Sequence, residues 1–289
     1  MYASPQYLDI VILYIKITSV TIAGHRREDA VSTTWEPTTY LRYDSERSRP
    51  FLDLLARVRT ADVSRIVDLG CGPGHLSAVL RSRWPAAQVL GIDSSVQMIE
   101  RARAEDQDPR TTYECADLRD WHPEQPVDLL VSNAALQWVP GHLDLLPGLA
   151  ETVAPAGALA ISVPSNFDAP SHVILHELSG RAPYAEHVPA DGHASATGAQ
   201  EFLDVLARPG WRADAWETTY LHVLSGPDPV FEWIRGTGAR PVLQSLPDQL
   251  LERFTTEYKA RLREAYPERA YGTVLPFKRT FVVAHREDA

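Results

Sequence analysis

The chain has 289 residues, which is enough for one large domain with insertions or for two small domains. Its hydrophobic content of 44% and charged content of 23% are ordinary for a soluble globular protein. The formal net charge of -10 argues against nucleic acid as the main partner, because non-specific binding to nucleic acid depends on neutralising phosphates.

The first 31 residues are predicted to be an N-terminal extension that the fold does not need. The segment from Tyr7 to Ile17 is apolar except at Asp9 and Lys16, and it is shorter than the roughly 20 residues that cross a membrane. A secretory signal would require basic residues before this segment, and there are none. We therefore expect no membrane partner, and we expect one domain over residues 32–289.

Strand-like and helix-like segments alternate from residue 65 onward. The predicted strands are 65–69, 88–92, 111–115, 127–132 and 157–163. Helix-like stretches lie between most of them, which predicts an α/β fold with a mostly parallel, Rossmann-like sheet and helices on both faces. Residues just past the carboxyl ends of such strands converge on one ligand-binding cleft.

Two of the predicted helices have clear sequence signals. Ser94-Ser95-Val96-Gln97 has the form of a capping box and predicts the start of a helix. Leu143, Leu146 and Leu149-Ala150 recur at helical spacing and predict a second helix with one apolar face.

The second half of the chain is less regular. Residues 201–207 and 247–262 are predicted helices, and 211–220 and 277–284 are predicted strands. The apolar stripe of the 247–262 helix is expected to face a core, and it consists of Leu250, Leu251, Phe254, Tyr258 and Leu262. We predict that insertions at about 164–200 and 221–275 form a mainly helical cap over the cleft.

A glycine-rich turn, Gly70-Cys71-Gly72-Pro73-Gly74, follows the first of these strands and precedes a helix. This arrangement presents backbone N–H groups and the positive end of a helix to a ligand. Asp93 stands 19 residues beyond Gly74 at the end of the next strand, where an acidic side chain can accept hydrogen bonds from ribose hydroxyls. The chain is therefore predicted to bind a nucleoside-containing cofactor.

The spacing of the glycines disfavours a dinucleotide. His75 occupies the place of the third glycine in the G-x-G-x-x-G fingerprint, where helix and strand must pack closely. The turn, Gly91-Ile92-Asp93 and Cys115-Ala116-Asp117 together resemble the segments by which class I methyltransferases bind S-adenosyl-L-methionine (SAM).

This resemblance implies roles for individual residues. The glycine turn would hold the methionine part of SAM, Asp93 the ribose, and Asp117 the adenine amino group, while Asn133-Ala134 would lie beside the transferred methyl. The full set of cofactor-binding residues that it implies is Tyr40, Asp68, Gly70, Cys71, Gly72, Gly74, Asp93, Ser94, Asp117, Leu118, Asn133 and Ala134.

Further segments extend the resemblance to the trans-aconitate 2-methyltransferase family over residues 32–287. They are 40–50, Leu136-Gln137-Trp138-Val139, Pro170-Ser171-His172-Val173, Thr218-Thr219-Tyr220 and Thr237-Gly238-Ala239-Arg240-Pro241. The resemblance implies methyl transfer from SAM to one carboxylate of trans-aconitate, a small tricarboxylate.

Such a reaction needs no general base, because a carboxylate is already deprotonated at neutral pH. It does need cations that fix the other carboxylates, and the planar fork of arginine suits this task. The candidates for positioning the substrate are Arg47, Arg49, Arg240 and Arg279, with His172 and Tyr220 as hydrogen-bond donors. Trp138 and Tyr40 are candidates to face the sulfonium, since aromatic faces attract cations. No metal site is predicted.

The sequence leaves alternatives open. A SAM enzyme for another small acid or a hydroxyl compound would share the turn and differ in the cap. A nicotinamide-dependent oxidoreductase is disfavoured by His75, and a non-catalytic SAM-sensing module remains a third class. Cys71 and Cys115 are too few for a disulfide scaffold, so we expect a cytoplasmic protein with reduced thiols. We also expect a monomer or a small homo-oligomer.

Overall fold

The structure is a computed structural model that describes residues 44–188 and 197–288. The predicted extension and Tyr40 lie outside the described residues, so their predictions stay open.

The centre of the molecule is one eight-stranded sheet in the order β3-β2-β1-β4-β5-β8-β6, with the short β7 paired to β8. The first five strands are parallel, and β8 runs antiparallel between β5 and β6. The strands are β1 (Arg65–Leu69), β2 (Gln88–Asp93), β3 (Thr111–Cys115), β4 (Val127–Asn133), β5 (Val153–Pro164), β6 (Trp211–Leu224), β7 (Glu268–Arg269) and β8 (Gly272–Arg286). The predicted α/β fold with a Rossmann-like sheet is confirmed.

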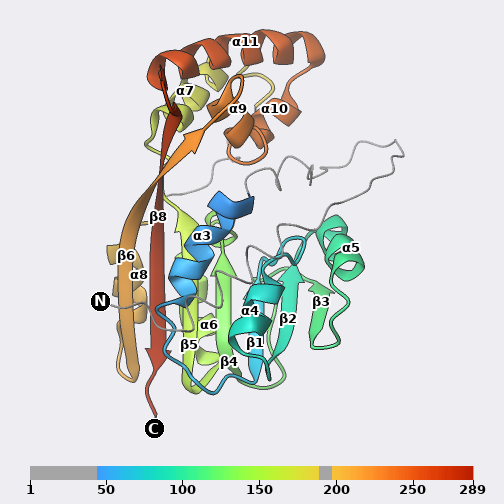
Figure 1. The fold of residues 1–289 in the computed structure, drawn as a ribbon, viewed down its shortest axis with the longest axis vertical. Coiled ribbons are helices and arrows are strands. Elements are labelled where there is room, and N and C mark those ends of the chain that lie inside the picture. The colour runs from blue at the N-terminus through green and yellow to red at the C-terminus, as the bar shows by residue number, and fades with distance from the viewer. Residues whose placement is uncertain (1–43, 189–196, 289) are drawn as a thin grey trace.

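Several strands are longer than predicted: β5, predicted at 157–163, begins at Val153, and the largest differences lie in the second half of the chain. The strands predicted at 211–220 and 277–284 are β6 and β8, which run to Leu224 and start at Gly272. Figure 1 shows both strands rising beyond the rest of the sheet toward the helices at the top. Cross-strand pairing explains the extra length, because β6 and β8 pair in register from Trp211–Arg286 to Leu224–Thr273.

Helices cover both faces of the sheet. On one face lie α3 (Asp44–Leu55) and α4 (Ser77–Arg83), and on the other lie α6 (His142–Glu151) and α8 (Ala199–Leu206) (Figure 1). Helix α5 (Val96–Glu105) packs against β2 and β3. Its N-cap is Ser95, whose side chain accepts a hydrogen bond from the Met98 N–H, so the capping box predicted to start at Ser94 was wrong by one residue.

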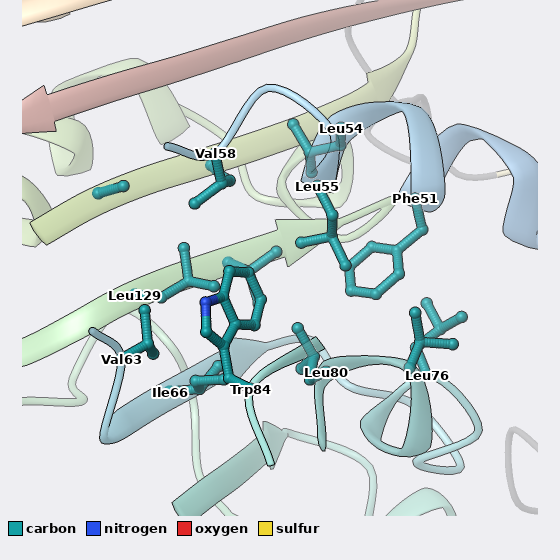
Figure 2. Close-up of a cluster of buried hydrophobic side chains, with 14 of the residues drawn as sticks. Phe51, Leu54, Leu55, Val58, Val63, Ile66, Leu76, Leu80, Trp84 and Leu129 are labelled. Atoms are coloured by element: carbon teal, nitrogen blue, oxygen red, sulfur yellow. The ribbon is translucent and has the colours of Figure 1, made fainter. Parts of the chain in front are cut away.

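Side chains from α3 and α4 meet in the cluster drawn in Figure 2. Phe51, Leu54 and Leu55 of α3 pack with Leu80 of α4 over the sheet residue Leu129, and all five are at most 1% exposed. This packing holds α3 against the sheet beside α4, the helix that follows the glycine turn. Each fully buried side chain of this size contributes about 1.5–3 kcal/mol relative to an exposed one.

A second hydrophobic cluster lies in the cap. It is built by α7 (Pro170–Ser179), α9 (Pro229–Ile234), α10 (Arg240–Ser245) and α11 (Asp248–Ala265). Phe254, Tyr258 and Leu262 of α11 are buried in it, and Leu250 and Leu251 pack at its margin, which confirms the predicted apolar stripe. The division of the chain into one domain with two insertions remains a prediction.

Candidate active site

The glycine turn is fastened to the end of β2. The Gly70 and Cys71 N–H groups both donate to the Ile92 carbonyl, at 2.7 and 2.9 Å. Gly70, Gly72 and Gly74 all have positive φ (77°, 56° and 76°), which favours glycine. A Cβ at Gly70 would lie 2.1 Å from the Ala135 Cβ, whereas a Cβ at Gly72 would meet nothing within 4 Å. The turn is therefore packed at Gly70 and open at Gly72.

Asp93 links the turn to the start of α5. Its Oδ2 accepts a hydrogen bond from the Gly72 N–H at 3.0 Å, and its Oδ1 accepts one from the Ser95 N–H at 2.9 Å. Burial raises the pKa of Asp93, and these two hydrogen bonds partly offset that rise. Because a carboxylate can accept about four hydrogen bonds, both oxygens can still accept from a ligand.

Asp68 lies beside Asp93 and is only 2% exposed. Burial, together with the charge of Asp93, raises the pKa of Asp68 to about 7. Burial also raises the pKa of the neighbouring Cys71 thiol, so this cysteine stays a neutral thiol rather than a nucleophile.

A cavity of about 560 Å³ lies over the turn, and we call it the turn cavity. All but two of the predicted cofactor-binding residues line it, namely Asp68, Gly70, Cys71, Gly72, Asp93, Ser94, Asp117, Leu118, Asn133 and Ala134. One exception is Tyr40, which is not described. The other is Gly74, which packs against Tyr113: a Cβ at Gly74 would lie 2.5 Å from the Tyr113 hydroxyl.

Asp117 is held by a neighbouring arginine at the rim of this cavity. The Arg119 Nε and Nη2 donate to its carboxylate at 3.0 and 2.5 Å, and the Arg119 backbone N–H donates at 2.9 Å. These bonds lower the pKa of Asp117 to about 2. The carboxylate stays ionised, but much of its accepting capacity is already used.

The end of β4 is shaped by an unusual backbone at Ala134. This residue has φ 58°, in the left-handed region that non-glycine residues rarely adopt, and its N–H donates to the Ser162 carbonyl at 2.8 Å. The single-turn helix η1 (Leu136–Trp138) follows at once. Strained backbone of this kind gathers at functional sites, where surrounding contacts hold it.

A smaller cavity of about 100 Å³ lies between this edge of the sheet and the cap, and we call it the cap cavity. Its walls are largely apolar, with Phe167, Val230, Trp233, Ile234, Leu275 and Phe277 among them. Four residues line both cavities: Asn133, Ala134, Trp138 and Thr237. We call these four residues the shared wall. The two cavities therefore meet beside the end of β4.

Arg279 brings a positive charge to the cap cavity. Its side chain is 5% exposed, and it donates from Nε to Ser162 Oγ at 3.1 Å and from Nη2 to Asn133 Oδ1 at 2.9 Å. A planar guanidinium fixed by two side chains keeps its orientation, which suits recognition of a carboxylate.

His172 also lines the cap cavity and is 6% exposed. Burial and the nearby charge of His176 lower the pKa of His172 to about 4, so the imidazole is neutral at neutral pH. Its ring packs edge-on against Phe167, with centroids 5.1 Å apart. A Cβ at Gly238 would come within 2.7 Å of the His172 Nε2, so the absence of a side chain at Gly238 allows this placement.

Other predicted substrate residues lie elsewhere. Tyr220 is part of the hydrophobic core, and its hydroxyl donates to Asp53 Oδ2 at 2.7 Å. A phenol has only one hydrogen to donate, so the prediction that Tyr220 donates to the substrate is wrong. The Arg49 guanidinium stands 5.2 Å from the centre of the Tyr220 ring and is not among the lining residues of either cavity. Arg240 lines the turn cavity rather than the cap cavity. The side chain of Arg47 lies outside the described part.

Sequence reasoning missed several residues of the cap cavity. Gln137, Asn166, His222, Trp233 and Phe277 all line it. Gln137 stands in a segment that carried the family resemblance, which was the available signal. His222 of β6 stacks on Trp233 of the following helix α9 with ring centroids 4.6 Å apart, and such a tertiary contact leaves no pattern in the sequence.

Residues 44–188 and 197–288 contain no group of three or more His, Cys, Asp or Glu side chains placed to hold a metal ion. No helix in this part of the chain is long and apolar enough to cross a membrane.

Known proteins are similar to this chain over most of its length. The profile of the methyltransferase domain family matches residues 66–157. A trans-aconitate 2-methyltransferase of Streptomyces avermitilis is 48% identical over 267 residues, covering 89% of this chain and 99% of the relative. Proteins of the same name are 44% identical in Methylobacterium nodulans and 41% identical in Escherichia coli O157:H7, with 87% and 88% of this chain covered and 98% and 99% of the relatives.

Solved structures share the fold at lower identity. A chain of the complex between the Haloferax volcanii Trm112 methyltransferase activator and a methyltransferase aligns with a TM-score of 0.52 and 18% identity, over 90% of this chain and 100% of that one. The YcgJ protein of Bacillus subtilis aligns with a TM-score of 0.50 and 14% identity, over 82% of this chain and 98% of that one.

Proposed function

Because this chain belongs to the trans-aconitate 2-methyltransferase family, we propose that it transfers a methyl group from SAM to one carboxylate of trans-aconitate, giving the monomethyl ester. The structural observation that best supports this is the shared wall. A cavity over a glycine turn meets a second cavity that contains a buried arginine, and both reach Asn133 and Ala134. A donor in one cavity and an acid in the other would therefore be neighbours.

The turn cavity fits SAM. Gly72 has an open side where a Cβ would meet nothing within 4 Å, so a ligand can approach the backbone closely. Asp93 would accept from the ribose hydroxyls, Asp117 and Leu118 would border the adenine, and Asp68 would face the positively charged methionine end. When bound, SAM supplies a methyl group on a sulfonium, and this methyl passes to a carboxylate oxygen while the electron pair of the broken C–S bond stays on sulfur.

In the cap cavity, Arg279 would bind one carboxylate of the acid. The neutral His172 would contribute a hydrogen bond without adding charge. The aromatic walls would remove water from the reacting carboxylate, which is a weak nucleophile when hydrated. Trp138 belongs to the shared wall and is 39% exposed, so its ring can face the sulfonium from the side of the acid.

The chain's own residues need no proton-transfer step. A substrate carboxyl titrates near pH 4 and is ionised at neutral pH. Holding the two reactants in line can supply roughly 7–11 kcal/mol of the barrier. Arg279 and the shared wall would do this by fixing the acid against the turn cavity.

The rival within the same chemistry is a methyltransferase for a different acid. The test is turnover of labelled SAM with trans-aconitate, cis-aconitate, isocitrate and citrate, with the product identified as a methyl ester. We expect the highest kcat/KM for trans-aconitate. A preference for another acid, or SAM binding without turnover on any acid, would contradict the proposal.

We also propose that the protein is a cytoplasmic monomer or small homo-oligomer. Cys71 and Cys115 are both free thiols, as expected in a reducing compartment. Light scattering of the purified protein would give the oligomeric state.

A further inference from the structure

Gln137 is a buried polar residue at the shared wall. It lies in η1, lines the cap cavity and is 5% exposed. Its Nε2 donates to the Ala134 carbonyl at 2.7 Å. This bond fixes which end of the amide is nitrogen, because only the NH2 group can donate to a carbonyl.

The residue that Gln137 holds is the one with the left-handed backbone. Ala134 has φ 58° and lines both cavities. An alanine disfavours this conformation and keeps it only where neighbouring contacts impose it. Two such contacts are present, the Gln137 amide on the Ala134 carbonyl and the Ser162 carbonyl on the Ala134 N–H.

A second observation points to the site itself. Gln137 Oε1 is buried and has no hydrogen-bond partner among residues 44–188 and 197–288. Native structures rarely keep such an atom in their interior without a role. Gln137 lines the same cavity as Arg279, so the side chain that holds Ala134 also borders the proposed acid site.

Together, Arg279 and Gln137 hold consecutive residues of the shared wall. Arg279 binds the side chain of Asn133, and Gln137 binds the backbone of Ala134. We propose that Gln137 is a positioning residue for methyl transfer, which fixes the Ala134 backbone between donor and acid. This inference rests on the proposed function, whose active centre it refines.

The first test is Gln137→Met, which keeps the length of the side chain and removes its donor and acceptor. We expect kcat with trans-aconitate to fall about 10- to 100-fold, as small misplacements of reactants do. The affinity for S-adenosylhomocysteine, measured by calorimetry, should fall much less than kcat, because Gln137 lines only the cap cavity and reaches the turn cavity only through Ala134. If Gln137→Met is insoluble, Gln137→Glu at pH 8 replaces it, with the same expectation.

Ser132→Ala is the matched control. Ser132 is 2% exposed, and its Oγ donates to the Leu69 carbonyl at 2.8 Å, so this variant also loses a buried hydrogen bond from a side chain to the backbone. Ser132 is not among the lining residues of either cavity. We expect a Tm loss similar to that of Gln137→Met and an unchanged kcat. Equal kcat losses in both variants would mean that Gln137 acts only through stability.

A rescue experiment separates backbone positioning from direct contact with the acid. Glycine adopts φ 58° without the steric penalty of alanine. The kcat loss caused by Gln137→Met should therefore be several-fold smaller in an Ala134→Gly background. An equal loss in both backgrounds would overturn the inference.

Hydrogen exchange tests the same idea without turnover. Gln137→Met should speed exchange of the Ala134 N–H by at least several-fold, and Ser132→Ala should not. If the wild-type protein does not methylate trans-aconitate, the proposed function is wrong, and the exchange rate at Ala134 still tests whether Gln137 fixes this backbone. If Gln137→Met keeps both the kcat and the Ala134 exchange rate of the wild type, Gln137 is not a positioning residue.

Discussion

The guanidinium of Arg279 donates a 2.9 Å hydrogen bond to Asn133 Oδ1, joining the last strand of the sheet to the end of β4. The two residues are 146 positions apart in the chain. Asn133 belongs to the shared wall, whereas Arg279 lines only the cap cavity. One bond therefore connects the charge proposed to hold the acid to the residue that borders the donor.

Arg279→Lys keeps the charge and removes the planar fork. We expect kcat/KM for trans-aconitate to fall about 10- to 100-fold, because a hydrogen bond to a charged group contributes about 1.5–3 kcal/mol and each 1.36 kcal/mol is a factor of ten. Steady-state kinetics with each substrate varied would measure it, and the larger change should be in the KM for the acid.

Arg286→Lys serves as the control for Arg279. Arg286 lies on the same strand, and its Nη1 donates to the Val153 carbonyl at 2.6 Å away from both cavities. This variant should keep wild-type kinetics. If Arg279→Lys raised the KM for SAM as much as the KM for the acid, the assignment of Arg279 to the acid site would be wrong.

Asp93 and Asp117 should differ in their importance for cofactor binding. Asp93→Asn loses an acceptor that also holds the turn through Gly72, and we expect the affinity for S-adenosylhomocysteine to fall at least about tenfold. Asp117→Asn should cost less, since Arg119 already occupies much of that carboxylate. Calorimetric titration of both variants is the measurement, and a larger loss at Asp117 would reverse the assignment of the two acids.

Local patterns were sufficient to predict the strands and the turn. β1, the glycine turn, α4 and β2 follow one another in the chain, and their spacing predicted both the fold and the place of Asp93. Contacts between distant segments were not predictable in this way. The sequence predicted Tyr220 as a hydrogen-bond donor to the substrate, but in the structure its hydroxyl donates to Asp53, 167 residues away in the chain. Gln137 acquires its significance from the backbone of Ala134, and no residue type signals a left-handed alanine.

Gly72 and Gly74 should respond differently to alanine. Gly74→Ala would place a Cβ 2.5 Å from the Tyr113 hydroxyl at φ 76°, so we expect a clear loss of stability. Gly72→Ala would meet nothing within 4 Å, so its main effect should be weaker binding of SAM, with about 1 kcal/mol lost from its positive φ. Thermal unfolding with and without S-adenosylhomocysteine distinguishes them. Strong ligand stabilisation of Gly72→Ala would place the cofactor away from that glycine.

Asp68 should make the stability of the ligand-free protein depend on pH. Its pKa is raised from 3.8 to about 7 in the folded protein, so the folded state keeps a proton that the unfolded chain has lost between these values. The free energy of unfolding therefore falls as pH rises from 4 to 7. The pKa difference corresponds to at most about 4 kcal/mol for this fully buried carboxyl.

Asp68→Asn removes that charge without changing the shape of the side chain. We expect the variant to have a higher Tm than the wild type at pH 8, and the difference should shrink as the pH is lowered to 5. Asp62→Asn is the control, because Asp62 is exposed and lines neither cavity, and it should shift Tm little at either pH. A Tm difference for Asp68→Asn that is the same at pH 5 and pH 8 would mean that Asp68 is ionised in the folded protein at both. The buried carboxylate would then have a counter-charge close to it.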